Sequence, residues 1–166
     1  MEFDPTYDYG MSDLTVDENA LRWQFSSLLT TLITLASNAQ RQIAIIGIGA
    51  VCEEMAEDFY SYFTLPCQSY LNHNLLTSPQ AEKLRELDAF FDARSGEHLD
   101  MDFWDHSFLA TNPDWDSVRQ KASSILELLG MQNLRVEFDR EEKYNSTAEG
   151  QRLVMQATRT RLVFAN

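Results

Sequence analysis

The feature that most constrains this fold is a series of long stretches in which apolar residues recur at three- and four-residue steps. Such spacing places the apolar side chains on one face of an α-helix and leaves the opposite face polar. From about 16 to 36 this pattern predicts a first helix, and Thr15 followed by Glu18 has the spacing of a capping box at its start. The expected apolar face of this helix consists of Leu21, Phe25, Leu28, Leu29, Leu32, Ile33 and Ala36.

A second helix is predicted from about 39 to 63, and it should stop before Pro66. Its first half is apolar on all sides, which is typical of a helix at the centre of a bundle. Gly47 and Gly49 fall inside this stretch, and we interpret them as small residues that let a neighbouring helix pack closely.

Two more helices are marked by signals at their ends. Ser78-Pro79 and Asn112-Pro113 each combine a capping residue with proline, which is favoured in the first helical turn. Ser95-Gly96 closes the first of these helices, and Gly130 closes the second, since glycine readily adopts the backbone conformation that ends a helix.

After Gly130 the periodicity changes to two. Leu134, Val136 and Phe138 alternate with charged residues, and residues 162–164 form a second short apolar run. We therefore predict a mainly α, single-domain helical bundle over residues 15–166, to which a short C-terminal β-hairpin can be appended. Residues 132–166 stay open between a small β-appendage and irregular structure, and residues 1–14 are expected to form an extended arm.

The composition has one unusual property, which is its charge. The chain has 26 Asp and Glu residues against 13 Lys and Arg, a formal net charge of −13. Residues 1–116 contain 20 acids and 5 bases, a balance of −15, whereas residues 117–166 contain 6 acids and 8 bases, a balance of +2. A negative field repels phosphate backbones, so we expect no nucleic-acid partner and favour a basic protein partner.

Localisation follows from two absences in the sequence. The longest apolar run, residues 43–52, is shorter than the roughly 20 residues that a membrane span needs, so no membrane association is expected. The only two cysteines, Cys52 and Cys67, form no metal-binding pattern and are expected to be reduced thiols. We therefore expect a cytoplasmic protein.

Three patterns invite a catalytic or cofactor interpretation, and each lacks a necessary part. Gly47-x-Gly49 has neither the third glycine of a dinucleotide fingerprint nor an acid about twenty residues later. The acids of residues 53–58 lack the Glu-x-x-His partner of a di-metal bundle, and Asp102 with His106 lacks a second histidine motif. We predict no enzyme, no cofactor and no metal site.

The segment from Glu97 to Trp115 combines acids with Phe103, Trp104, Phe108 and Trp115. Aromatic anchors inside a charged rim are typical of a protein-binding patch. The same rings can equally belong to the core, and the sequence leaves this open. The predicted partner-binding residues, on this segment and on the two preceding helices, are Glu53, Glu54, Glu57, Asp58, Asp88, Asp92, Glu97, Asp100, Asp102, Trp104 and Asp105.

This profile, with AVCEEMAEDF at residues 50–59 and FWDHSFL at residues 103–109, resembles the immunity proteins of bacterial toxin–immunity systems. It looks most like those of contact-dependent growth inhibition. The resemblance implies that the chain binds and neutralises a cognate toxin domain in the cytoplasm, often a basic nuclease, by occluding its active site. Two alternatives are an acidic helical adaptor without a toxin partner and, less favoured, a metal-dependent enzyme.

Overall fold

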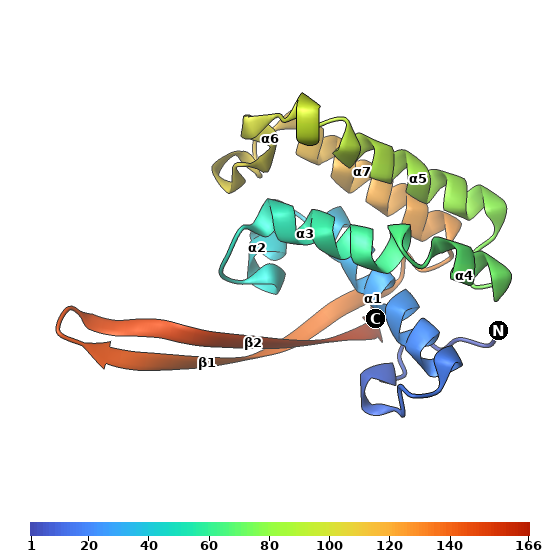
Figure 1. Ribbon diagram of the computed structural model, residues 1–166, viewed down its shortest axis with the longest axis horizontal. Coiled ribbons are helices and arrows are strands. Elements are labelled where there is room, and N and C mark those ends of the chain that lie inside the picture. The colour runs from blue at the N-terminus through green and yellow to red at the C-terminus, as the bar shows by residue number, and fades with distance from the viewer.

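The computed structural model describes residues 1–166, which form a helical body and a long β-hairpin that projects from it (Figure 1). The predicted mainly α bundle with a C-terminal hairpin is confirmed. The body contains seven α-helices: α1 (Asp17–Ala36), α2 (Ala39–Ile46), α3 (Val51–Phe59), α4 (Cys67–Asn72), α5 (Ser78–Asp92), α6 (Met101–Trp104) and α7 (Pro113–Leu128). None of them combines the length and the apolar content needed to cross a lipid bilayer.

Helix α1 is the centre of the body. It packs against α7 and α3, and Leu28, Leu29, Leu32 and Leu35 are completely buried. The predicted apolar face of the first helix is therefore confirmed for its leucines, whereas Ala36 at the helix end is only half-buried. Helices α5 and α7 lie side by side and cover the rest of the core (Figure 1).

The predicted second helix from 39 to 63 is wrong in its continuity. Gly47 ends α2 with a φ of 86°, and Gly49 has a φ of 123°, so the chain turns between α2 and α3. Residues with a side chain rarely adopt such angles, which explains glycine at both positions. The glycines therefore break the helix and do not serve close helix packing.

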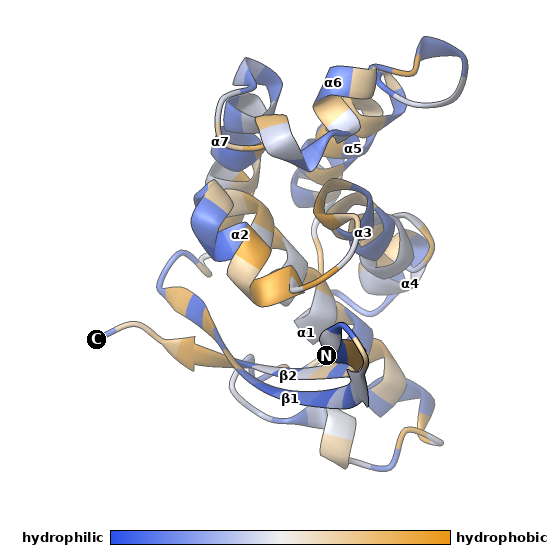
Figure 2. Cartoon of the chain, turned by 90° about the vertical axis from the view of Figure 1, so that its left-hand side faces the viewer, coloured by the Kyte–Doolittle hydropathy of each residue, from blue (hydrophilic) through white to orange (hydrophobic).

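Helix α2 also lies at the surface and not at the centre of the bundle. Ile43 and Ile48 are 43% and 59% exposed. In Figure 2, the apolar C-terminal end of α2 and the turn after it lie on the side of the helical body next to the hairpin. The apolar composition of this segment marks an exposed patch beside the hairpin.

Two predicted helix starts need correction. Thr15 does not cap α1, because its hydroxyl donates to Asp13 at 2.7 Å and Val16 occupies the N-cap position. A capping box does form at α5, where Thr77 is the N-cap and Gln80 its partner, one residue earlier than predicted from Ser78. The α5 helix then ends at Asp92, before the Ser95-Gly96 signal, because residues 93–95 form a turn.

The start of α7 follows the prediction. Asn112 accepts a hydrogen bond from the backbone of Asp114 at 2.9 Å, and Pro113 occupies the first helical position. Gly130 follows the helix end with a φ of 70°.

Between these helices the chain forms short turns of other kinds. Helix α3 continues into a π-helical turn, η2 (Tyr60–Thr64), before Pro66. Three 3₁₀ turns complete the body: η1 (Tyr9–Met11), η3 (Gly96–His98) and η4 (His106–Phe108).

The first 14 residues pack against α1, whereas we had expected an extended arm. Tyr9 is buried within the turn η1, and the ring of Phe3 lies 5.0 Å from that of Phe25 in an edge-to-face arrangement. The aromatic residues of this segment hold it on the body, although most of its other residues are polar.

The C-terminal hairpin is far longer than the short one predicted. Strands β1 (Leu134–Thr147) and β2 (Gly150–Phe164) pair antiparallel, with one irregularity between Lys143 and Tyr144. We call residues 134–164 the arm. Leu134, Val136 and Leu162 at its base are buried, whereas every residue from 141 to 152 is exposed.

Polar contacts fix the base of the arm to α2. The guanidinium of Arg140 donates to the carbonyls of Ala44 and Ile45 at 2.8 and 2.9 Å, near the C-terminal end of α2. These carbonyls lack helical donors, and the negative end of the helix dipole favours a cation there. The side-chain carbonyl of Gln156 accepts from the backbone of Ile48 at 3.0 Å, which ties the glycine turn to the arm.

Candidate functional site

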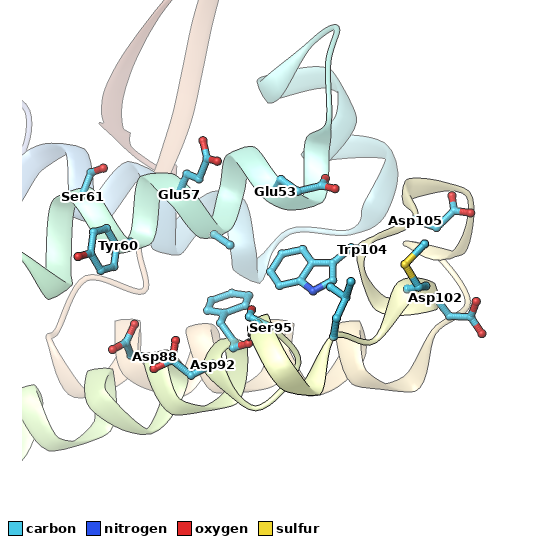
Figure 3. A pocket seen from close by; sticks show the side chains of 15 residues that line it. Glu53, Glu57, Tyr60, Ser61, Asp88, Asp92, Ser95, Asp102, Trp104 and Asp105 are labelled. Carbon is cyan, nitrogen blue, oxygen red and sulfur yellow. Dashed lines mark hydrogen bonds between the residues drawn. The ribbon is translucent and has the colours of Figure 1, made fainter.

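A groove of about 1010 Å³ runs between α3 on one side and α5 with α6 on the other. Figure 3 shows α3 and α5 on opposite sides of this groove, with Tyr60 and Trp104 between them. We call it the acidic groove, and its lining residues are Glu53, Ala56, Glu57, Tyr60, Ser61, Asp88, Phe91, Asp92, Ser95, Gly96, Leu99, Met101, Asp102, Trp104 and Asp105.

Helical spacing places four carboxylates of this groove in two pairs. Glu53 and Glu57 are four residues apart on α3, and Asp88 and Asp92 are four apart on α5, so each pair shares one helix face. In Figure 3, Asp88 and Asp92 lie on the side of α5 that faces α3, whereas Glu57 points away from α5 and Glu53 extends toward the end of the groove near Asp105. Asp102 and Asp105, from α6 and the residue after it, complete the open end.

The acidic groove contains six carboxylates and no lysine, arginine or histidine. None of the six takes part in a salt bridge, although several acids elsewhere pair with nearby bases, such as Asp114 with Arg94 at 2.8 Å. Unneutralised charges along one concave surface add their fields, so the groove has a negative potential that attracts cationic groups.

Internal hydrogen bonds reach only two of these carboxylates. Asp88 accepts from the hydroxyl of Thr64 at 3.0 Å, and its pKa is raised because burial disfavours its charged form and Asp92 lies nearby. Asp105 accepts from the backbone and the hydroxyl of Ser107, and these bonds lower its pKa. The other four have no hydrogen-bond partner within the protein and are free to accept donors from outside.

Apolar side chains line the same groove and remain accessible. Tyr60, Leu99 and Met101 are 52%, 55% and 72% exposed. Trp104 is half-buried, and its indole N–H donates to the carbonyl of Arg94 at 2.7 Å, which fixes the ring orientation. The groove therefore combines apolar contact area with a rim of acids, as protein-binding sites do.

The structure brings seven of the eleven predicted partner-binding residues together in this groove: Glu53, Glu57, Asp88, Asp92, Asp102, Trp104 and Asp105. The other four lie elsewhere. Asp100 caps α6 by accepting from the backbone of Phe103 at 3.3 Å, and Glu97 is exposed in the turn η3. Glu54 and Asp58 lie on the opposite side of α3.

That opposite side of α3 borders a second cavity of about 470 Å³, formed with α1, the N-terminal segment and β2. Asp58 lies in its wall, and burial, together with Glu54 and Glu57 nearby, raises its pKa to about 6. Neither Glu54 nor Asp58 takes part in a salt bridge. Because α3 lies between the two cavities, the four acids of residues 53–58 divide between two surfaces.

The four aromatic rings that the sequence left open also divide. Phe103 and Trp115 are completely buried and stack 4.6 Å apart, and the indole of Trp115 donates to the carbonyl of Phe103. Phe108 is 43% exposed, and Trp104 lines the groove. Two rings therefore belong to the core and two remain available at the surface.

Sequence reasoning missed the apolar rim residues Tyr60, Leu99 and Met101. The available signal was the alternation of acid and apolar residues in Leu-Asp-Met-Asp from residue 99 to 102, within too short a segment to form a stable amphipathic helix. Exposed apolar side chains next to unpaired acids are the combination that indicates a site.

The structure also places the residues that invited a metal, dinucleotide or thiol interpretation. No group of three or more His, Cys, Asp or Glu side chains is placed to hold a metal ion. The dinucleotide interpretation of Gly47-x-Gly49 fails because α2, not a strand, precedes the glycines. Cys52 and Cys67 are free and buried, and burial raises the pKa of the Cys52 thiol to about 12, so it stays protonated.

No protein-family model, no curated protein and no solved structure matches this chain.

Proposed function

We propose that this protein is an immunity-type inhibitor whose acidic groove binds a basic region of a cognate toxin and blocks the toxin's active site. The observation that carries the proposal is the groove itself, where six carboxylates without ion-pair partners surround exposed apolar side chains. The bacterial toxin–immunity pairs that the sequence resembles supply the class of partner. The protein would act in the cytoplasm, together with its toxin.

The missing ion pairs favour binding of a cationic surface. An incoming lysine or arginine need not break an internal salt bridge, and it gains charge-assisted hydrogen bonds to carboxylates such as Glu57 and Asp92. The apolar stem of the same side chain can pack on Tyr60 or Trp104, whose ring faces attract cations. The groove therefore suits arginine- or lysine-rich segments of a folded basic domain.

Occlusion follows from the same complementarity. A nuclease-type toxin needs a positive cleft to bind nucleic acid, and an acidic protein competes for that cleft. The charge of −13 also speeds the encounter, since opposite charges steer association at low ionic strength. The association rate constant should fall steeply with added salt, whereas a rate constant independent of salt would contradict steering.

The direct test is co-expression with the product of the gene immediately upstream, followed by growth assay and purification of the complex. We expect protection from growth arrest and a complex that is stable at low salt. Absence of both would refute the proposal. Recovery of only neutral or acidic partners would instead support an acidic adaptor.

A matched pair of variants tests the groove. Replacing Glu57, Asp92 and Asp102 by their amides removes three groove charges, and we expect at least a tenfold weaker affinity for the toxin, about 1.4 kcal/mol or more. The control replaces the exposed acids Glu127, Glu141 and Glu149 by glutamine, which removes the same net charge outside the groove. Equal weakening in both variants would show that net charge and not the groove determines binding.

A further inference from the structure

The arm extends well beyond the part that the body supports. Its contacts with the body end at Arg140, Gln156 and Arg159, the last of which pairs with Asp8. No hydrogen bond or salt bridge joins residues 141–155 to the helical body. An isolated two-stranded hairpin is only marginally stable in water, so a projection of this length indicates a further contact.

The two edges of the arm differ in how well they are protected. Seven of the nine residues from 135 to 143 on β1 are charged, which blocks pairing with another strand. Residues 153–158 on β2, with the sequence LVMQAT, carry no charge. The arm also contains no proline. The outer edge of β2 is therefore the edge open to pairing.

Exposure identifies the same segment. Val154 is 51% exposed and Met155 is 37% exposed, and Ala157 is exposed beside them. The irregularity in the hairpin pairs Lys143 with Met155 and Tyr144 with Leu153, so Val154 has no partner on β1. An exposed apolar strand edge without charge or proline offers its backbone groups to another chain.

We propose that the β2 edge pairs with the same edge of a second copy, in antiparallel orientation, to form a two-fold symmetric dimer with a four-stranded sheet. This inference goes beyond the proposed toxin binding and uses a different surface. The predicted strand order is β1-β2-β2-β1, with the two β2 strands in the middle.

The distribution of charge favours contact between two copies through their arms. Residues 134–164 carry 6 bases and 5 acids, a balance of +1, whereas residues 1–133 carry 7 bases and 21 acids, a balance of −14. Two copies repel each other least where the arms meet and the acidic bodies stay apart (Figure 1). A neutral edge also offers no charge that would select a basic or an acidic foreign strand.

The register follows from the uncharged segment LVMQAT, which lies opposite its own copy when the axis passes near its middle. Pairing centred on Met155 places Val154 opposite Gln156, Leu153 opposite Ala157 and Arg152 opposite Thr158 of the second copy. The dimer axis is therefore expected to pass near Met155.

A pairing of about six residues on each side buries less than the roughly 1,200 Å² of a standard stable interface. We expect a weak dimer whose population rises with protein concentration. Salt should strengthen it, because screening reduces repulsion between two bodies of the same sign. This is opposite to the salt dependence expected for toxin binding.

Sedimentation equilibrium of the full chain, over two decades of concentration at low and high salt, tests the proposal. The edge variant carries Val154→Lys with Ala157→Lys, and the control carries Asn145→Lys with Ser146→Lys on β1 of the same arm. We expect dimers for the wild type and the control and monomers for the edge variant. A wild type that stays monomeric throughout, or a control that dissociates as fully as the edge variant, would overturn the proposal.

Cross-linking tests the register without relying on stability. Met155→Cys lies near the proposed axis and should give a covalent dimer on mild oxidation, whereas Asn145→Cys on β1 should give little. Equal yields from the two positions would contradict the register. The groove variants of Glu57, Asp92 and Asp102 should dimerise normally, so failure of dimerisation and failure of toxin binding remain distinguishable.

Discussion

The helical body and the arm are stabilised by different physical effects. The body encloses a continuous apolar core in which α1 is surrounded by α3 and α7, and its stability comes from burial and close packing. The arm contributes only Leu134, Val136 and Leu162 to that core and otherwise depends on strand pairing and a few polar anchors. The comparison shows that one short chain combines a domain around an apolar core with a projection that contributes little to that core.

The same contrast appears in the charges. The body concentrates unpaired acids in one groove, whereas the arm is nearly neutral and its base is crossed by ion pairs such as Arg161 with Glu137 at 2.9 Å. The two regions therefore offer two kinds of surface, one electrostatic and one based on backbone pairing. Four experiments sharpen this contrast, and the first has the largest expected effect.

Trp115→Ala should destabilise the body by about 3–5 kcal/mol, because it removes a fully buried ring and leaves a cavity beside Phe103. Urea denaturation followed by circular dichroism measures this loss. Trp23→Ala is the control, since Trp23 is 36% exposed and should cost much less. Equal losses would show that the core is not centred on the Phe103–Trp115 stack.

Arg140→Ala should loosen the arm and lower the free energy of unfolding by about 1–3 kcal/mol, because the carbonyls of Ala44 and Ile45 lose a charged donor. Hydrogen exchange should become faster in β1 and β2 while α1 remains protected. Arg152→Ala, which removes an exposed arginine without a salt-bridge partner, serves as the control. Unchanged exchange in the arm would refute the anchoring role of Arg140.

A pH-dependent effect is expected at Asp58, which lies at the seam between body and arm. Its pKa in the folded state is about 6, against an ordinary value of 3.8, so the folded state binds this proton more tightly than the unfolded state. Stability should therefore fall as pH rises from about 4 to about 6, and the penalty should be complete above that range.

Asp58→Asn removes this penalty. Thermal unfolding at several pH values should show the variant more stable than the wild type at neutral pH, with the advantage lost below about pH 4. Glu127→Gln, which removes one acid at an exposed position, is the control. A stability difference between variant and wild type that is the same at all pH values would mean that it does not come from ionisation of Asp58.

Tyr144→Ala should have the smallest effect, within about 0.5 kcal/mol, because Tyr144 is half exposed and contacts no part of the body. Dilute protein is required, so that dimer formation does not contribute. A larger loss in dilute solution would show that the distal arm is stabilised by the body after all.

Much of the helical fold was predictable from local pattern. The leucine spacing of α1 and the Asn112-Pro113 start of α7 determine these helices through side-chain periodicity and backbone capping, which are local properties. The break at Gly47 and Gly49 was missed because an apolar helix with two glycines and two helices joined by a glycine turn have the same composition. Only the docking of Gln156 from β2, more than a hundred residues later, distinguishes the two.

The candidate site was predictable in part. Acids four residues apart, such as Glu53 and Glu57, must share a helix face, so each pair was visible in the sequence. Which acids line the same groove depends on how α3 and α5 pack, and the sequence alone could not separate Glu54 and Asp58, which line the second cavity. The length of the arm was missed because residues 139–152 are mostly polar and show no period-two pattern.

The sequence by itself determined the apolar face of α1, the limits of α7 between Asn112-Pro113 and Gly130, and the excess of negative charge, since all three depend only on neighbouring residues or on composition. The tertiary structure alone decided that six acids converge in one groove without a base, that Phe103 and Trp115 lie inside, and that a nearly neutral arm projects from an acidic body. These outcomes depend on contacts between distant segments, whose free energies no local pattern records.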